Sequence, residues 1–172
     1  MLNSFQVTGS KLIGGIVLFV DVLKGALAVI LAERFFGGAF LPVAVSGVGA
    51  VVGHNFPVWL RFQGGRGLAT AAGTFAVLNF LCIAFWGLCW TAGYLLFRRV
   101  NLGNVLATIG LLIAIVLVPD QVLTTQIGPE VSIPGFKVFG VVLLTVLLTK
   151  HIDPVKDYLH ERKNLSRIQD KL

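Results

Sequence analysis

The chain has 172 residues, of which 56% are hydrophobic and only 13% are charged. A soluble domain carries about 25% charged residues, so this composition excludes a water-soluble enzyme and also a disordered chain, which would be polar. The net charge of +6 would suit a nucleic-acid partner, but the positions of the basic residues around apolar segments argue against one. The sequence predicts an all-α, polytopic integral membrane helical bundle.

Six apolar segments follow one another along the chain. A helix needs about 20 residues to cross the hydrocarbon core of a bilayer. The run from 68 to 97 has no charge over 30 residues, and as one helix it would be about 45 Å long against a core of about 30 Å. We therefore divide it near Asn79. The six expected segments, of which the second and third are short, are 12–32, 39–53, 68–78, 80–97, 102–118 and 136–149.

The basic residues are distributed unevenly between the two sides of this bundle. With six crossings, both chain ends lie on one side, which then carries eleven Lys and Arg residues, whereas the other side carries only Arg34 and Lys137. Short cytoplasmic loops are enriched in Lys and Arg, so both termini are expected in the cytoplasm. The chain divides into a transmembrane domain, 1–150, and a charged cytoplasmic tail, 151–172.

The segment 53–70 holds the densest cluster of polar residues. Three glycines bracket Arg66 directly before an apolar helix. Backbone N–H groups in such a loop, together with the helix dipole, favour an anion, and an arginine offers a bidentate fork to phosphate or carboxylate. Arg61 and His54 could add two further nitrogen donors near the same anion. The alternative is a tight turn whose arginines anchor the membrane interface through lipid headgroups.

Asp21 and Lys24 lie three residues apart on one face of the first expected helix. Charges inside an apolar span are costly and often functional. The alternative is a self-neutralising pair that helps helices pack.

The sequence GHNFPVWLRFQGGRGLAT, residues 53–70, resembles the second signature of the bacterial acyl-phosphate-dependent glycerol-3-phosphate acyltransferases, the PlsY family, which is close to GHxFPxFLxFKGGKGxAT. Gln63 and Arg66 stand where that signature has lysines. Asp21 to Gly25 is similar to the family's DxxKG motif, which favours a role of Asp21 and Lys24 in shaping the site.

Two further signatures of the family are only partly matched. Asn3 and Ser4 resemble the end of the first signature, in which Gln6 replaces an arginine, and we expect the chain to lack the rest of that signature and the first transmembrane helix. His151 matches the start of the third signature, HxxNIxRL, but Pro154 stands where that signature has asparagine.

The resemblance implies a membrane acyltransferase in the bacterial inner membrane with its active loops facing the cytoplasm. Its substrates would be acyl phosphate and glycerol 3-phosphate, and its products lysophosphatidic acid and phosphate. The resemblance also implies that the protein is in contact with membrane lipid. No metal or other cofactor is required, because acyl phosphate is already activated. The implied catalytic residues are Arg66, His54 and His151. The implied substrate- and phosphate-binding residues are Asn3, Ser4, Asp21, Lys24, Arg61, Gly64, Gly65, Gly67 and Thr70.

Two other functions compete with this interpretation. The departures at Gln6, Gln63 and Pro154 would suit a catalytically impaired relative, or a truncated fragment, that binds a phosphate ester or a lipid. A small transporter or channel is less favoured, because the sequence has no inverted repeat and little polar lining.

Overall fold

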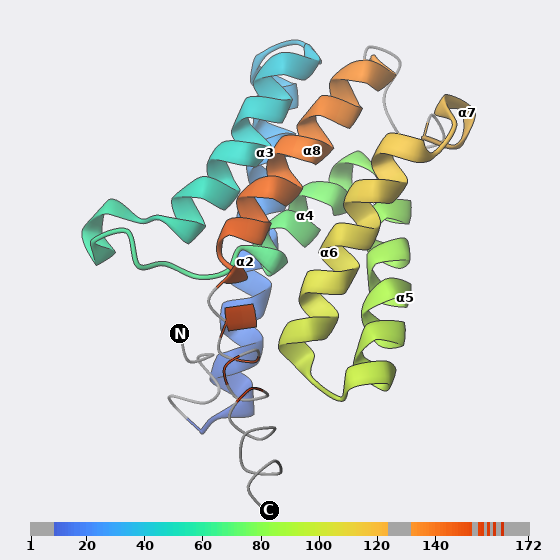
Figure 1. Cartoon of the computed structure of the whole chain (residues 1–172). Coiled ribbons are helices and arrows are strands. Elements are labelled where there is room, and N and C mark those ends of the chain that lie inside the picture. Colours follow the sequence, from blue (N-terminus) through green and yellow to red (C-terminus); the bar gives the residue numbers. More distant parts are fainter. Residues whose placement is uncertain are drawn as a thin grey trace, which may run out of the picture.

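The computed structural model describes residues 9–123 and 132–152, together with residues 155, 156, 158, 160 and 163. Its regular elements are all helical (Figure 1). Four stretches are long and apolar enough to cross a membrane, as the composition predicts. The elements are α2 (Lys11–Phe35), α3 (Phe40–Asn55), the 3-10 turn η1 (Val58–Leu60), α4 (Leu68–Leu78), α5 (Phe80–Phe97), α6 (Val100–Leu117), α7 (Asp120–Leu123) and α8 (Ile133–Thr149).

The uncharged run 68–97 is broken at the predicted place. Asn79 adopts an extended backbone with φ −162° between α4 and α5. Its side-chain oxygen accepts a hydrogen bond from the Leu81 amide at 3.0 Å, which caps α5, and its side-chain nitrogen donates to the Leu123 carbonyl at 3.3 Å. Both polar ends of this buried side chain are satisfied, so the break costs little in an apolar interior.

The two shorter apolar helices are α4 and α8. The sequence predicts that 39–53 and 68–78 are the two short segments, and the corresponding helices α3 and α4 have 16 and 11 residues. α3 continues to Asn55 and η1 follows it closely, so the apolar stretch reaches Leu60 and spans 21 residues. α8 starts earlier than expected because Ser132 caps it and Pro134 occupies its first turn.

α2 and α4 cross with their backbones in contact. A Cβ atom at Gly25 would meet the carbonyl oxygen of Thr70, and a Cβ at Gly73 would meet the carbonyl oxygen of Val22. Each helix thus uses a glycine to accept the backbone of the other, the device by which membrane helices pack closely. This crossing fixes Asp21 beside the start of α4.

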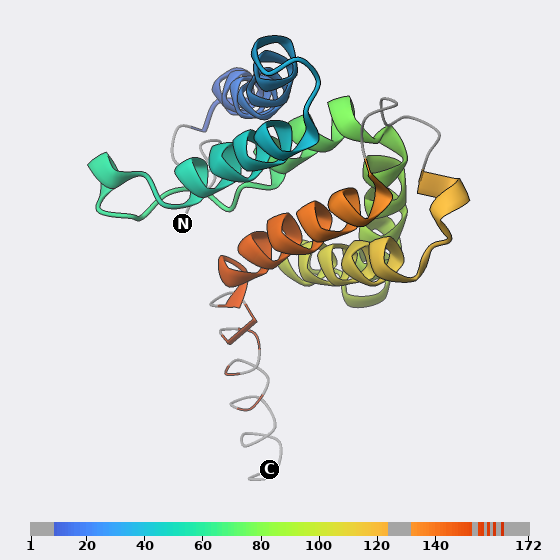
Figure 2. The same ribbon diagram turned by 90° about the horizontal axis from the view of Figure 1, so that it is seen from above.

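α8 packs between α3 and α6. Seen from above, α2 lies outermost beside α3 and α4, and α5 packs against α6 and meets the end of α4 (Figure 2). Phe75 of α4 makes edge contacts with Phe136 and Phe139 of α8 at the centre. Two tryptophans join α5 to α6, since Trp86 donates to the Thr108 hydroxyl at 3.2 Å and Trp90 to the Asn104 oxygen at 2.8 Å.

The start of α2, the α5–α6 turn and the end of α8 lie toward one end of the bundle (Figure 1). This arrangement agrees with an even number of crossings. Of the predicted tail, 151–172, most residues lie outside the described part of the chain, so the division into two domains stays a prediction.

Candidate active site

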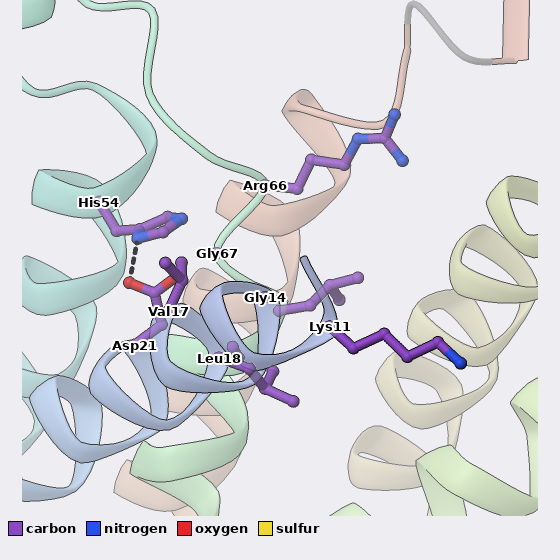
Figure 3. Close-up of a pocket in the computed structure, with 10 residues that line it drawn as sticks. Lys11, Gly14, Val17, Leu18, Asp21, His54, Arg66 and Gly67 are labelled. Atoms are coloured by element: carbon purple, nitrogen blue, oxygen red, sulfur yellow. Dashed lines mark ion pairs between the residues drawn. The ribbon is translucent and has the colours of Figure 1, made fainter. Parts of the chain in front are cut away.

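An open cavity of about 570 Å³ lies where α2 meets the end of α3 and the start of α4 (Figure 3). One wall is the first part of α2, and the opposite wall is the segment that leads into α4. The lining residues include two cations, one carboxylate and one imidazole. They are Lys11, Gly14, Val17, Leu18, Asp21, His54, Arg66, Gly67, Leu68 and Ala69.

Asp21, Lys24 and His54 form one cluster, although His54 lies 30 residues after Lys24 in the sequence and belongs to a different helix. Asp21 Oδ1 lies 3.1 Å from Lys24 Nζ and 3.1 Å from His54 Nδ1. Lys24 Nζ lies 3.0 Å from the same imidazole nitrogen. Nδ1 of His54 is therefore engaged on the α2 side, which fixes the ring and directs Nε2 toward the glycine loop (Figure 3).

The predicted glycine loop folds back onto the end of α3. The Gly64 amide donates to the Asn55 carbonyl at 3.2 Å, and the Gly65 amide donates to the His54 carbonyl at 3.0 Å. These two amides are therefore used within the chain and do not point at a ligand, unlike the arrangement expected from the sequence. Gly64 and Gly65 also have no room for a side chain. A Cβ at Gly64 would meet the His54 carbonyl oxygen, and a Cβ at Gly65 would meet the His54 ring.

The first residues of α4, and not the Gly64 and Gly65 amides, offer backbone N–H groups to the cavity. Gly67 precedes the helix with φ 75°, a conformation suited to glycine, and no side chain caps the helix. Its Cα faces the side chain of Asn55, which leaves no room for a Cβ. The first amides of a helix have no acceptor within the helix and carry partial positive charge. Leu68 and Ala69 line the cavity, so this helix end can bind an anion.

Arg66 lines the same cavity, but its guanidinium points away from the His54–Asp21 pair (Figure 3). Its Nη1 donates a 2.6 Å hydrogen bond to Asn101 Oδ1 in the first turn of α6. Arg61 lies outside the cavity lining, on the loop that carries η1. The structure thus brings Arg66 and His54 to one cavity and does not bring Arg61 there.

His151 lies directly after α8 and is 1% exposed. Its Nδ1 lies 2.8 Å from the Leu147 carbonyl, which only accepts, so Nδ1 carries the proton of this hydrogen bond. Burial lowers the pKa of His151, and the Arg66 charge lowers it further, whereas the Leu147 carbonyl raises it. The lowered pKa favours the neutral imidazole, and among the described residues its buried Nε2 is an acceptor with no hydrogen-bond partner.

Thr70 is fully buried in the first turn of α4, and its hydroxyl has no hydrogen-bond partner. The side chain of Asn55, at the end of α3, is likewise buried with both polar atoms unpaired. Buried polar groups are normally satisfied, so polar atoms left unpaired near the start of α4 are consistent with a place for a polar ligand.

Sequence reasoning missed several residues of this site. Asn101 lies in the first turn of α6, and nothing in its sequence context indicates a contact with Arg66. Asn55 occupies a variable position of the matched signature, and Lys11 was counted only as a basic flank. Asn3 and Ser4 lie outside the described residues. Within the described part of the chain, no group of three His, Cys, Asp or Glu could hold a metal ion.

Comparison with known proteins relates this arrangement to one family. The family model described as Glycerol-3-phosphate acyltransferase matches residues 1–161. A glycerol-3-phosphate acyltransferase of Wolbachia sp. subsp. Brugia malayi is 39% identical over 102 residues, which cover 59% of this chain and 53% of that protein. Another, of Gluconobacter oxydans, is 46% identical over 87 residues, covering 50% of this chain and 37% of that one. The chain thus spans about half the length of the curated relatives it matches.

Two crystal structures of PlsY (YgiH), an integral membrane glycerol 3-phosphate acyltransferase, share this fold. The glycerol 3-phosphate form has a TM-score of 0.71 at 27% identity, covering 92% of this chain and 72% of that one. The lysophosphatidic acid form has a TM-score of 0.72 at 27% identity, covering 91% of this chain and 74% of that one. The helical bundle described above is therefore an integral membrane fold.

Proposed function

Since the chain belongs to the glycerol-3-phosphate acyltransferase family, we propose that it transfers an acyl group from acyl phosphate to the sn-1 hydroxyl of glycerol 3-phosphate. The products are lysophosphatidic acid and inorganic phosphate. The observation that carries this proposal is the cavity at the uncapped start of α4, which Arg66 and His54 also line. Crystals of a related protein hold glycerol 3-phosphate in one form and lysophosphatidic acid in another.

In this proposal the phosphate of one substrate binds at the start of α4. The amides of Leu68 and Ala69 and the guanidinium of Arg66 attract it, and the Thr70 hydroxyl adds a polar contact. Asn101 of α6 holds the Arg66 side chain in place, because its Oδ1 accepts a 2.6 Å hydrogen bond from Arg66 Nη1. The glycines Gly64, Gly65 and Gly67 keep the backbone close to α3 so that this arrangement fits. Positioning two anions together supplies most of the catalysis, because the acyl phosphate is already activated.

The two histidines have different tasks in the proposed reaction. The sn-1 oxygen attacks the acyl carbonyl carbon, the carbon–oxygen bond to phosphate breaks, and phosphate leaves with the bonding electron pair. We assign the hydroxyl proton to Nε2 of neutral His151. This residue does not itself line the cavity, but it lies near enough to Arg66 for the Arg66 charge to lower its pKa. His54 orients the loop, because Asp21 and Lys24 already engage its Nδ1.

We also propose that the site faces the cytoplasm of a bacterial cell. In the topology predicted from the sequence, most of the Lys and Arg residues fall on the side that carries the start of α2 and the end of α8, and this bias is typical of the cytoplasmic side. One acyl chain of substrate and product then stays in the inner leaflet of the plasma membrane. Membrane vesicles of known orientation, treated with a membrane-impermeant thiol reagent after Arg98→Cys substitution, test this placement.

The direct test is transfer of the acyl group from acyl phosphate to labelled glycerol 3-phosphate by the purified chain in proteoliposomes. We expect labelled lysophosphatidic acid and an equal amount of inorganic phosphate. Arg66→Ala should abolish the transfer, and Arg61→Ala should retain it, because only Arg66 lines the cavity. Full activity of a folded Arg66→Ala variant would contradict the proposal.

A phosphate-ester or lipid binder without turnover is the second candidate. It is favoured by the replacement of a signature lysine by Gln63, which is exposed and leaves the loop with fewer cations than the family pattern. A thermal shift on adding glycerol 3-phosphate, with no product formed over many hours, would identify this function instead.

A further inference from the structure

The loop between α3 and α4 carries an apolar tip that is largely exposed among the residues that the structure describes. Val58 is 71% exposed, Trp59 81%, Leu60 54% and Phe62 59%. In both views the loop extends away from the other helices (Figures 1 and 2), and in Figure 1 it turns sideways from the axis of α3. It lies between the levels of the two ends of α2, and the α5–α6 turn reaches further toward the end of the bundle where α2 starts (Figure 1).

Six consecutive backbone amides of this loop, those of residues 60–65, have backbone partners. The amides of residues 60, 61, 62 and 63 donate to the carbonyls of Pro57, Val58, Pro57 and Leu60, at 3.0 to 3.1 Å. The next two amides, of Gly64 and Gly65, donate to the end of α3. Six consecutive amides are thus paired within the segment. A loop that faces water can leave backbone amides to bond with solvent. Backbone in contact with lipid needs internal hydrogen bonds, because hydrocarbon offers no partner to an N–H group.

The base of the loop is tied to the bundle. Lys150, at the end of α8, donates to the Phe62 carbonyl at 3.3 Å, and its Nζ lies 4.1 Å from the centre of the Phe56 ring. Arg61 and Phe62 both adopt left-handed backbone conformations, with φ 50° and 63°. Such conformations are costly for residues with side chains and persist only where the surroundings hold them. Here they turn the chain back sharply, which leaves the apolar tip outermost.

The chemistry of the tip matches the boundary between headgroups and acyl chains. Tryptophan is enriched at this depth because its ring has an apolar body and one polar N–H group. Arg61 adds a cation beside the tip, and residues 55–68 contain no Asp or Glu. An arginine with apolar neighbours can place its stem in the acyl region and its head among lipid phosphates.

We infer that the tip formed by Val58, Trp59, Leu60 and Phe62 inserts into the lipid boundary of the leaflet on the side of the site, with Arg61 bound to lipid phosphates. The partner is the phospholipid bilayer itself. The same segment continues into Arg66 and the start of α4, so insertion of the tip holds this wall of the cavity next to the membrane. This inference does not depend on the proposed acyl transfer, because it rests on the exposure and the backbone pairing of the loop.

Depth-dependent quenching of tryptophan fluorescence tests it. The full chain is reconstituted in vesicles of phosphatidylethanolamine and phosphatidylglycerol that carry bromine atoms either near the headgroup or near the end of the acyl chain. The chain has three tryptophans, so the emission lost in Trp59→Phe isolates the signal of Trp59. The emission lost in Trp86→Phe, from the middle of α5, gives a reference inside the bilayer.

We expect bromine near the headgroup to quench Trp59 several-fold more than bromine near the chain end, and aqueous iodide to quench it little. Trp86 should show the opposite preference between the two lipids, and this preference should persist in Trp59→Phe if that variant keeps its fold. Quenching of Trp59 by iodide and by neither lipid would place the loop in water and overturn the inference. Quenching by none of the three would mean that protein, such as a second copy of the chain, covers the tip, and would overturn it as well.

Discussion

Gly65→Ala is the substitution that most sharply tests the packing of the glycine loop on His54. The added Cβ would meet the imidazole at Nε2, and it would lie 2.7 Å from both Cδ2 and Cε1 of the ring. Ordinary contact between carbon atoms is at about 3.5 Å or more, so the ring must move by roughly 1 Å. The ring cannot shift freely, because its Nδ1 is engaged by Asp21 and Lys24.

The expected loss of activity follows from that displacement. A misplacement of about 1 Å in a catalytic arrangement can cost about 100-fold in rate, and overpacking of this kind costs about 1–3 kcal/mol of stability. We therefore expect kcat/KM for glycerol 3-phosphate to fall by about 100-fold, while the protein remains folded in detergent. The measurement is lysophosphatidic acid formation in proteoliposomes, together with the thermal unfolding midpoint.

Gly53→Ala is the matched control. Gly53 directly precedes His54, and a Cβ there would meet no atom within 4 Å. Alanine is favoured over glycine in a helix by about 1 kcal/mol, so this variant should be as active as the parent and at least as stable. Wild-type activity of a folded Gly65→Ala protein would refute the idea that the loop positions the histidine.

Three further predictions concern packing, titration and the arginine. Gly25→Ala should lower the free energy of unfolding by about 1–3 kcal/mol in thermal or denaturant unfolding, because the Cβ would meet the backbone of Thr70 and neither helix can yield. Burial lowers the pKa of His151, so its neutral form stabilises the fold above about pH 6.5 and this contribution declines as pH falls below that value, by at most about 1.4 kcal/mol per pH unit. Unfolding followed from pH 8 to pH 5 should show this decline, and His151→Gln should remove it. Asn101→Ala should raise KM for glycerol 3-phosphate about 10-fold with a smaller change in kcat, since Arg66 loses a 2.6 Å hydrogen bond.

Much of the fold is predictable from composition and segment length. The break at Asn79 follows from the mismatch between 30 uncharged residues and the thickness of a bilayer, and the structure confirms it. Membership of the glycerol-3-phosphate acyltransferase family is also confirmed by the family model. The sequence could predict it because many consecutive residues of segment 53–70 match the family signature. The helix α3 agrees with the expected segment 39–53 to within two residues at either end, whereas the 3-10 turn that follows it has no periodic signal in the sequence.

The site was less accessible to sequence reasoning. Spacing along α2 predicts the contact between Asp21 and Lys24, but the inclusion of His54 depends on how α3 packs against α2. The direction of a backbone amide cannot be read from residue types, so the sequence could not show that the Gly64 and Gly65 amides bond to the end of α3. The separation of Arg61 from Arg66 likewise depends on two left-handed residues, neither of which is glycine.

Equilibrium binding of labelled glycerol 3-phosphate in the absence of acyl phosphate tests the central claim, that a phosphate group binds at the start of α4 beside Arg66. We expect saturable binding by the parent chain, an affinity at least 10-fold weaker for Arg66→Ala, and an unchanged affinity for Arg61→Ala. Equal affinities of the parent and Arg66→Ala, or an equal loss in both arginine variants, would contradict the account.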